Sequence, residues 1–392
     1  MQLCMPYASV FMLALGMNDL EVGIIASIYM FSQMICAFLS GAITDRLGRR
    51  FTTAAFDFLA WSMPCLIWAF SEGFWFFAVA ALLNGTMKIT TVSWDCLLVE
   101  DAQRSQITQI YSLVIICGNL SALFAPISSI LVSKLTLVPA IRILYINAFV
   151  FMTVKLFILY KLSKETDVGL RRKKESENQP FSKLLRGYGG VLNQMLHSRG
   201  TVFAVTISVL VEIVGMINAT FWQIIASKRI GVPDALLPIF PMVKSFLTIF
   251  FFFAVIGRIR QTKLKRPLLT GFICYVAGQA ALIIAGGGTF GYICLGASLV
   301  LESFASGALS TLRESIVAIY VDQSERSRVL GMLQTIVMLA SVPFGYIGGY
   351  LSSQSRVLPF VLNIALLMLG AVATARFFSA EGGKPEELSA QC

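Results

Sequence analysis

Charged side chains are scarce in this sequence, since Asp, Glu, Lys and Arg make up 13% of its 392 residues while 57% are hydrophobic. A typical soluble domain carries roughly 25% charged residues. The chain therefore has too little charge for a water-soluble globular protein of this length, and water is not expected to be its main solvent.

Catalytic and metal-binding residue types are also few. His197 is the only histidine, which leaves little material for histidine-based metal sites or for Ser-His-Asp and Cys-His catalysis. The eight cysteines include no Cys-x-x-Cys pair, and seven of them lie in apolar stretches, where we expect them to pack as small hydrophobic residues. No Gly-x-x-x-x-Gly-Lys-Ser/Thr phosphate loop is present. We predict neither enzyme activity nor a metal or other cofactor, and no pumping driven by ATP.

What the chain has in abundance is long apolar runs, most of them near the roughly 20 residues needed to cross a bilayer core about 30 Å thick. We predict an all-α membrane protein with twelve transmembrane helices. They lie at 3–17, 22–43, 51–70, 74–99, 107–132, 139–160, 201–225, 236–256, 267–285, 290–317, 329–351 and 358–378. The first run is short for a span and contains Pro6, so we expect an incomplete start or a tilted short helix.

A polar stretch divides these runs into two sets of six. It carries the basic run 171–174 among acidic and polar residues, a composition that cannot build a core of its own. The predicted domains are a six-helix half at 1–161, a cytoplasmic linker at 162–199, a second six-helix half at 200–379 and a cytoplasmic tail at 380–392.

The net charge of +10 follows membrane topology rather than one basic face, so we expect no nucleic-acid partner. Of the 31 Lys and Arg residues, 22 fall in the linker, alternate loops and tail, and five on the other side. Cytoplasmic loops are enriched in Lys and Arg. Both termini and the linker are therefore predicted to be cytoplasmic, in a multi-pass protein of the cell membrane.

The loop at 41–50 reads GAITDRLGRR, a glycine-punctuated turn that holds one carboxylate among three guanidinium groups. It resembles the signature of the major facilitator superfamily, Gly-x-x-x-Asp-Arg-x-Gly-Arg-Arg/Lys, at this same place between the second and third helices. Every signature position is matched, by Gly41, Asp45, Arg46, Gly48, Arg49 and Arg50.

The resemblance extends to the plan of six helices, a linker and six helices, and implies secondary transport by rocking of two halves. It also implies that Asp45 caps a helix of the other half, and that the arginines of the loop pair with Glu100 and Asp101 at the end of the fourth helix. These residues form the predicted cytoplasmic gate. The alternative is that the arginines only follow the positive-inside rule.

The transport site is expected among ionisable residues within the spans, because each costs roughly 2.5–3.5 kcal/mol at mid-helix unless it is paired or hydrated. The candidate pathway residues are Lys88, Asp95, Glu212, Lys244 and Glu302. The resemblance implies that the first, fourth, seventh and tenth helices line the cavity, which would include four of the five candidates, all except Lys244. Asn84 and Thr91 are expected to share one polar stripe with Lys88 and Asp95, and structural ion pairs between helices are the alternative.

We therefore predict a secondary active transporter that moves a small solute and acts as a monomer. If a proton is coupled to transport, Glu212 and Glu302 are its expected carriers. A non-transporting receptor or scaffold on the same fold is an alternative, as is a drug/proton antiporter. The antiporter is disfavoured by Ala125–Ser129, which has serines where the family's antiporter motif has glycines, and by Asn84 in place of an arginine. Substrate, direction and coupling ion are left open by the sequence.

The topology can be tested with reporter tags placed after Cys392 and within Lys164–Pro180. Both tags are expected to report the cytoplasm, because the bias in Lys and Arg is about four to one. An extracytoplasmic signal from either position would overturn the assignment.

Overall fold

A computed structural model describes residues 1–102, 110, 113–114, 117–118, 120–121, 124–177, 198–254, 264–320 and 326–380. Its helices are α1 (Ala8–Ala14), α2 (Asp19–Leu47), α3 (Arg49–Asp57), α4 (Met63–Ala69), α5 (Phe74–Gly85), α6 (Met87–Val99), α8 (Ile127–Leu135), α9 (Leu137–Leu162), α10 (Asp167–Glu177), α13 (Arg199–Ile225), α14 (Ile239–Ala254), α15 (Lys265–Ile284), α16 (Thr289–Tyr320), α17 (Arg326–Gln354) and α18 (Leu358–Ala380). Short 3-10 turns at Met5–Tyr7 and Asp234–Leu236 and π turns at Phe58–Ser62 and Ala226–Ile230 complete the described part, which contains no strand.

The predicted all-α membrane fold is confirmed. Within the described residues, nine helical segments are long and apolar enough to cross a membrane. Of the other three predicted spans, the first is a short apolar helix at Met5–Ala14, and the third is the continuous run of α3, a π turn and α4. The fifth predicted span lies largely outside the described residues. Among those described, α8 is the one helix that overlaps it.

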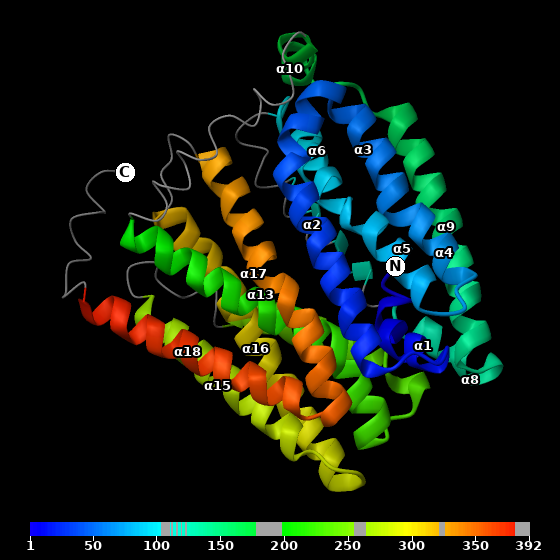
Figure 1. Ribbon diagram of the computed structural model, residues 1–392, viewed down its shortest axis with the longest axis vertical. Helices are drawn as coiled ribbons and strands as arrows, with labels where there is room; N and C mark the ends of the chain where they lie inside the picture. The colour runs from blue at the N-terminus through cyan, green and yellow to red at the C-terminus, as the bar shows by residue number, and fades with distance from the viewer. Residues whose placement is uncertain are drawn as a thin grey trace.

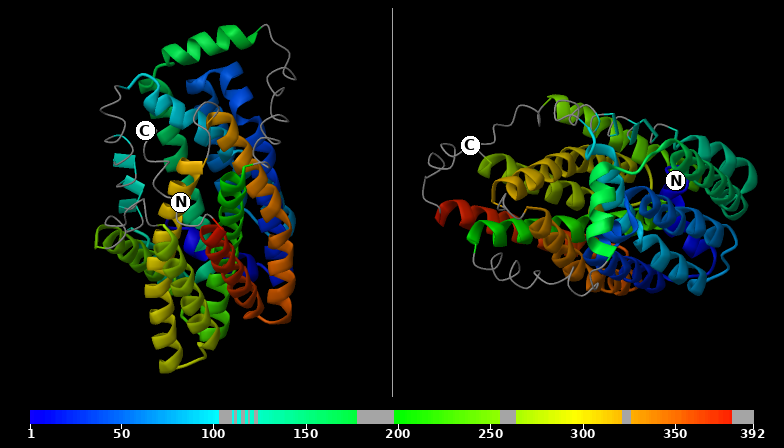
Figure 2. Two further views of the ribbon diagram at one scale, coloured as in Figure 1. Left: turned by 90° about the vertical axis from the view of Figure 1, so that its left-hand side faces the viewer. Right: turned by 90° about the horizontal axis from the view of Figure 1, so that it is seen from above.

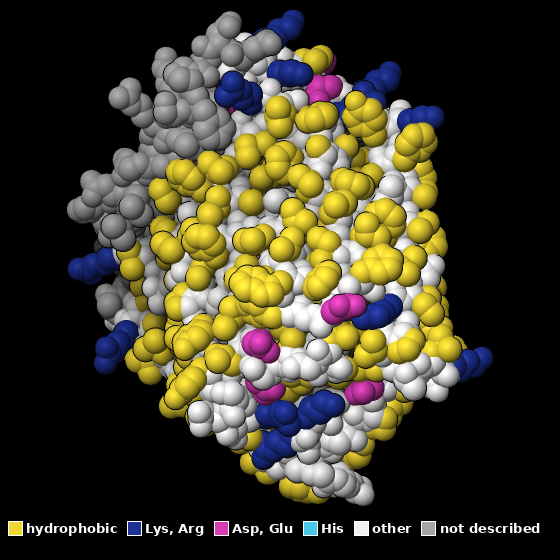
Figure 3. Space-filling model, turned by 45° about the vertical axis from the view of Figure 1, so that its right-hand side comes forward, with side chains coloured by type: hydrophobic (Ala, Val, Ile, Leu, Met, Phe, Trp, Pro, Cys, Tyr) yellow, Lys and Arg dark blue, Asp and Glu magenta, His cyan; other side chains and the backbone are white. Residues whose placement is uncertain are grey.

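The surface of the bundle agrees with burial in lipid. Large apolar side chains such as Phe151 on α9 and Ile273 on α15 are 73% and 65% exposed. Figure 3 shows hydrophobic side chains over most of the middle of one face, with Lys, Arg, Asp and Glu gathered toward its two ends. An exposed apolar surface of this extent is expected to face hydrocarbon.

Two local signals set the length of α2. Asn18 Oδ1 accepts the Glu21 N–H at 2.9 Å, and Glu21 Oε2 accepts the Asn18 N–H at 2.8 Å, which forms a capping box at the start. The helix ends at Gly48, whose φ of +88° is favourable only for glycine. Below, "linker end" denotes the end of the bundle where α2, α6 and α9 finish, and "opposite end" the end that contains Asn18.

Helices α2 and α17, one from each side of the linker, cross in direct backbone contact. A Cβ atom on Gly23 would lie 2.4 Å from the carbonyl oxygen of Gly345 and 2.6 Å from Cα of Gly349, so only glycines allow this approach. Ser27 Oγ donates to the Val342 carbonyl at 2.7 Å and accepts the Tyr346 N–H at 2.8 Å. These two backbone groups are four residues apart, on successive turns of the helix, so Ser27 binds α17 at both.

Further hydrogen bonds join the two parts of the chain at the opposite end. Ser9 Oγ donates to the Thr220 carbonyl at 2.6 Å, and Gln223 Nε2 donates to the Met5 carbonyl at 2.9 Å. Figure 1 shows α2 (blue) and α17 (orange) against each other near this end and spread apart toward the linker end. The two parts are therefore fastened at one end of the bundle.

Helix α10 was not predicted, because its charged composition suggested an unstructured linker. It packs on α2, where Ser176 Oγ donates to the Asp45 carbonyl at 3.0 Å. Figure 2 shows α10 lying across the linker end of the bundle.

Substitution of Gly23 tests the contact between α2 and α17. Overpacking costs about 1–3 kcal/mol, roughly a 5- to 150-fold shift in an equilibrium, so Gly23→Val should open the opposite end. We expect a membrane-impermeant thiol reagent to label Ser352→Cys faster when Gly23→Val is also present. Gly296→Ala is the control, because a Cβ there would meet nothing within 4 Å. An unchanged labelling rate would show that this contact does not close the opposite end.

Candidate functional site

The centre of the predicted gate is the guanidinium of Arg49, whose side chain is almost fully buried. Its Nη1 donates to Asp45 Oδ1 at 2.9 Å, and its Nε and Nη2 donate to the Glu100 carboxylate at 3.1 and 3.0 Å. Burial lowers the pKa of this group, but hydrogen bonds and charges from Glu100 and Asp45 outweigh it and leave the pKa above the usual value. One cation thus holds the ends of α2 and α6 together.

Glu165, which the sequence analysis did not single out, completes this cluster. Its carboxylate accepts the backbone N–H groups of Arg49 at 2.7 Å and Arg50 at 3.0 Å, so it caps the start of α3. Thr166 Oγ1 donates to Glu100. The sequence signal for Glu165 was an acidic residue directly after the sixth predicted span. Its role follows from the fold, which brings it to the start of α3, a helix without a side-chain cap of its own.

The remaining gate residues take separate positions. Arg50 binds the Tyr160 carbonyl and lies 4.2 Å from the centre of the Tyr160 ring, while Arg46 is exposed. Asp101 Oδ1 accepts the Asp167 N–H at 3.3 Å, and no described arginine pairs with it.

Among the described residues, Asp45 has no hydrogen bond or ion pair with the second half. In the described part of the chain, neither it nor any other predicted gate residue forms a hydrogen bond or ion pair with residues 198–380. The cap on a helix of the other half, which the resemblance implied for Asp45, is therefore not seen in this conformation.

Charges from both parts of the chain meet near the middle of the bundle. Arg313 Nη1 on α16 lies 3.7 Å from Glu212 Oε2 on α13. Lys88 on α6 is close enough for its charge to interact with both, and Tyr29 on α2 for its hydroxyl to interact with Glu212. Lys88 and Glu212, both candidate pathway residues, lie in one region, but the ion-pair partner of Glu212 is Arg313, which was not among the candidates.

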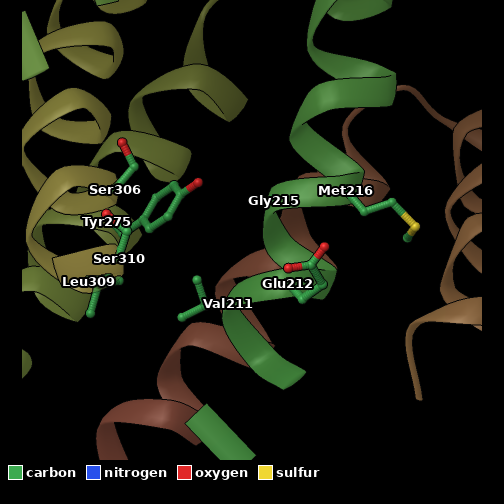
Figure 4. Close-up of a pocket in the computed structure, with 8 residues that line it drawn as sticks. All are labelled: Val211, Glu212, Gly215, Met216, Tyr275, Ser306, Leu309 and Ser310. Carbon is green, nitrogen blue, oxygen red and sulfur yellow. The ribbon is translucent and has the colours of Figure 1, made fainter. Parts of the chain in front are cut away.

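Beside this cluster lies a pocket of about 230 Å³. Figure 4 shows Glu212 and Met216 of α13 on one side and Tyr275, Ser306 and Ser310 of α15 and α16 on the other. Val211, Gly215 and Leu309 complete the lining. The pocket therefore offers one carboxylate, three hydroxyl groups and an apolar wall.

Glu302, by contrast, lies inside the second half and is 2% exposed. Its Oε1 accepts from Gln279 Nε2 at 2.7 Å and from Ser298 Oγ at 2.9 Å, and its Oε2 lies 4.0 Å from Lys244 Nζ. Carboxylate and ammonium thus form an ion pair between α14 and α16, in which the Glu302 carboxylate is buried and the Lys244 side chain is partly exposed.

A chain of buried amides links Glu302 to the pocket. Asn363 Nδ2 donates to Gln279 Oε1 at 3.1 Å and to Asn218 Oδ1 at 3.2 Å, and Asn218 Nδ2 donates to the Tyr275 hydroxyl at 2.8 Å. The sequence analysis missed Gln279 and Asn363, although an amide in the middle of an apolar run was a usable signal. Because Tyr275 also lines the pocket, this network connects the pocket to Glu302.

The predicted polar stripe on the fourth span is only partly present. Thr86 interrupts the helix between α5 and α6, and Asn84 Nδ2 donates to the Ala60 carbonyl at 2.6 Å, within the π turn. Asn84 therefore faces its own half. Asp95 has no hydrogen bond or ion pair among the described residues.

At the opposite end, a depression of about 820 Å³ lies between the two parts of the chain. It is lined by the cationic side chains Lys228, Arg229 and Arg356 and by one carboxylate, Asp19. Asp19 Oδ2 accepts from Ser352 Oγ at 2.6 Å and from Arg356 Nε at 3.4 Å, which joins α2 to the end of α17. No group of three His, Cys, Asp or Glu residues suited to a metal occurs among the residues that the structure describes.

Comparisons with solved structures give the same overall fold. The nucleoside transporter NupG, in a mutant form, superposes with a TM-score of 0.74 at 15% identity, over 96% of this chain and 95% of that one. The xylose transporter XylE from E. coli gives 0.66 at 14% identity over 98% and 93%. The human organic anion transporter MFSD10 gives 0.62 at 18% identity over 93% and 87%.

No curated protein matches the sequence significantly. The family model described as Major Facilitator Superfamily matches residues 1–301, which includes the predicted gate loop and the charged cluster around Glu212 apart from Arg313. The chain is therefore a multi-pass membrane protein that belongs to the Major Facilitator Superfamily.

Proposed function

We propose that this protein is a secondary active transporter that moves a small solute by alternating access. The half at 1–161 and the half at 200–379, joined by the linker at 162–199, would rock about a central site as a monomer. The observation that carries this proposal is the asymmetry of the bundle: α2 and α17 are fastened at the opposite end and spread apart toward the linker end. With the linker in the cytoplasm, this is an inward-facing state.

The gate residues support this assignment of state. Arg49 and Asp45 bind within the first half and not to the second, as expected for a cytoplasmic gate that is open. When the cytoplasmic side closes, the cluster of Arg49, Glu100 and Glu165 would hold the end of α2 in a fixed position against the second half. Asp45 would then meet the second half.

The pocket supports a small solute. Its volume of about 230 Å³ is below the roughly 300–1,000 Å³ of sites for drug-sized ligands, which disfavours the drug/proton antiporter. By their names, the transporters of similar structure carry nucleosides, organic anions or a sugar. What these names share is a small solute.

We favour a proton as the coupling ion, with Glu302 as its carrier. The pair of Glu302 and Lys244 lies in the membrane-spanning part of the second half, where a proton can neutralise the carboxylate and release the lysine. The amide network from Glu302 to Tyr275 offers a route by which this change reaches the pocket.

A cross-link at the opposite end tests alternating access. Because the side chains of Asp19 and Ser352 touch, cysteines at both positions are expected to form a disulfide that holds the protein inward-facing. Vesicles with Asp19→Cys/Ser352→Cys, in a background without native cysteines, would be incubated with a metabolite mixture and their contents identified by mass spectrometry. Oxidation should abolish accumulation, and a reductant should restore it.

The control for this test is Thr53→Cys/Ser93→Cys, a pair 2.9 Å apart within the first half, whose cross-link should leave accumulation intact. Full accumulation by the oxidised Asp19→Cys/Ser352→Cys protein would contradict alternating access. If the unmodified protein accumulates nothing, the scaffold alternative is favoured.

Substitution of Glu302 tests proton coupling. Glu302→Gln resembles the protonated acid, and it should retain exchange of solute across the membrane while losing accumulation driven by a pH gradient. Glu72→Gln, at an exposed position, is the control and should change neither. Normal gradient-driven accumulation by Glu302→Gln would exclude Glu302 as the carrier.

A further inference from the structure

We infer that the central site binds a small organic anion, whose carboxylate lies between Lys88 of the first half and Arg313 of the second. This inference rests on the proposed transport function and adds the chemical class of the solute. In the structure, Glu212 holds Arg313 by the ion pair at 3.7 Å. A bound carboxylate would share Arg313 with Glu212 and give Lys88 an anion, which none of the described residues supplies at ion-pair distance.

The position of Lys88 is the first argument. Its ammonium lies within the span Phe74–Val99 and is partly buried, yet no described residue provides a hydrogen-bond acceptor or a carboxylate at ion-pair distance. A cation at such a depth costs roughly 2.5–3.5 kcal/mol unless it is paired or hydrated. Its charge interacts with Glu212 and Arg313 across the interface between the halves, so it faces the solute pathway.

The carboxylates near Lys88 are the second argument. Among the described residues, the carboxylate whose charge interacts with Lys88 is Glu212, and Glu212 is already paired with Arg313 at 3.7 Å. Asp95 lies seven residues beyond Lys88, about 10 Å along the helix, and Glu302 is paired with Lys244. A carboxylate of the solute would therefore give Lys88 a partner that the described residues do not supply.

The shape of the pocket limits the rest of the solute. Hydroxyl groups of Tyr275, Ser306 and Ser310 lie across the pocket from Glu212, and Met216 and Leu309 supply apolar surface. A body with hydroxyl groups or a small ring fits this lining, within a volume of about 230 Å³.

The depression at the opposite end points to the same class of solute. It is lined by Lys228, Arg229 and Arg356 against Asp19, and Asp19 is already bound to Arg356 and Ser352. A surface hollow lined mainly by one sign of charge raises the local concentration of ions of the other sign. An extracytoplasmic entrance of this kind favours anions over cations and neutral solutes.

The test uses pairs of compounds that differ in one negative charge: lactate with lactamide, nicotinate with nicotinamide, and gluconate with glucose. Binding to the purified full-length protein is measured as the rise in thermal stability with concentration, and uptake is measured in vesicles. We expect at least one acid to bind and to be taken up at least tenfold better than its uncharged partner.

Variants assign the preference to the site. Lys88→Gln should lower the affinity for that acid at least tenfold, while Lys88→Arg, which keeps the charge, should retain most of it. Arg313→Lys should also weaken binding, because a lysine cannot bind two carboxylates with a planar fork. The control is Lys161→Gln, which removes an exposed cation at the linker end of α9 and should leave the acid preference unchanged.

The outcomes separate this inference from the proposed function. Equal binding of acids and their uncharged partners, binding of none of the acids, or an acid preference that survives Lys88→Gln would each overturn the anion site. If vesicles then still accumulate other solutes from the metabolite mixture in a manner blocked by the Asp19→Cys/Ser352→Cys cross-link, the transporter assignment stands without it.

Discussion

The arrangement of the whole bundle depends on the contact of α2 with α17. Gly23, Gly345 and Gly349 remove the side chains that would keep the two backbones apart, and the Ser27 hydroxyl forms hydrogen bonds with the backbone of α17. Close approach of this kind is how helices associate in lipid, where hydrophobic burial supplies little driving force. Because this contact, here called the pivot, lies toward one end, it joins the two parts of the chain there in this conformation, while α2 and α17 lie apart toward the linker end.

A second constraint is that charge within hydrocarbon must be paired or hydrated. Lys155 on α9 meets this constraint by pairing with Asp57, and Lys244 by pairing with Glu302, each inside one half. The pair of Glu212 and Arg313 also lies inside one half, but it borders the pocket and interacts with Lys88 of the other. Only in this last cluster, among the described residues, do mid-span charges of the two halves face each other, so this is where a solute can change how the halves attract.

The fold and the family could be predicted from the sequence because both rest on local patterns. Apolar runs of span length and the ten residues of the loop at 41–50 need no knowledge of distant contacts. The partners of individual charges could not be predicted in the same way. Glu212 is paired with Arg313 on α16 and not with Lys88, a choice set by helix rotation that apolar runs do not encode. Three further side chains form hydrogen bonds with residues far away in the chain, those of Glu165, Gln279 and Asn363. Only the packed structure shows which residues they bind.

The positions of the pivot and of the charged cluster together suggest how solute binding could drive closure. Lys88 belongs to α6 of the first half and Arg313 to α16 of the second, and in this structure no described carboxylate lies at ion-pair distance from Lys88. A carboxylate held by both side chains would attract the two helices toward each other on the open side of the pivot. That attraction acts on the same α6 whose end carries Glu100, bound to Arg49 of the gate. Solute binding and gate closure would then be linked through one rigid helix, without any change in the contact between α2 and α17 until the gate has formed.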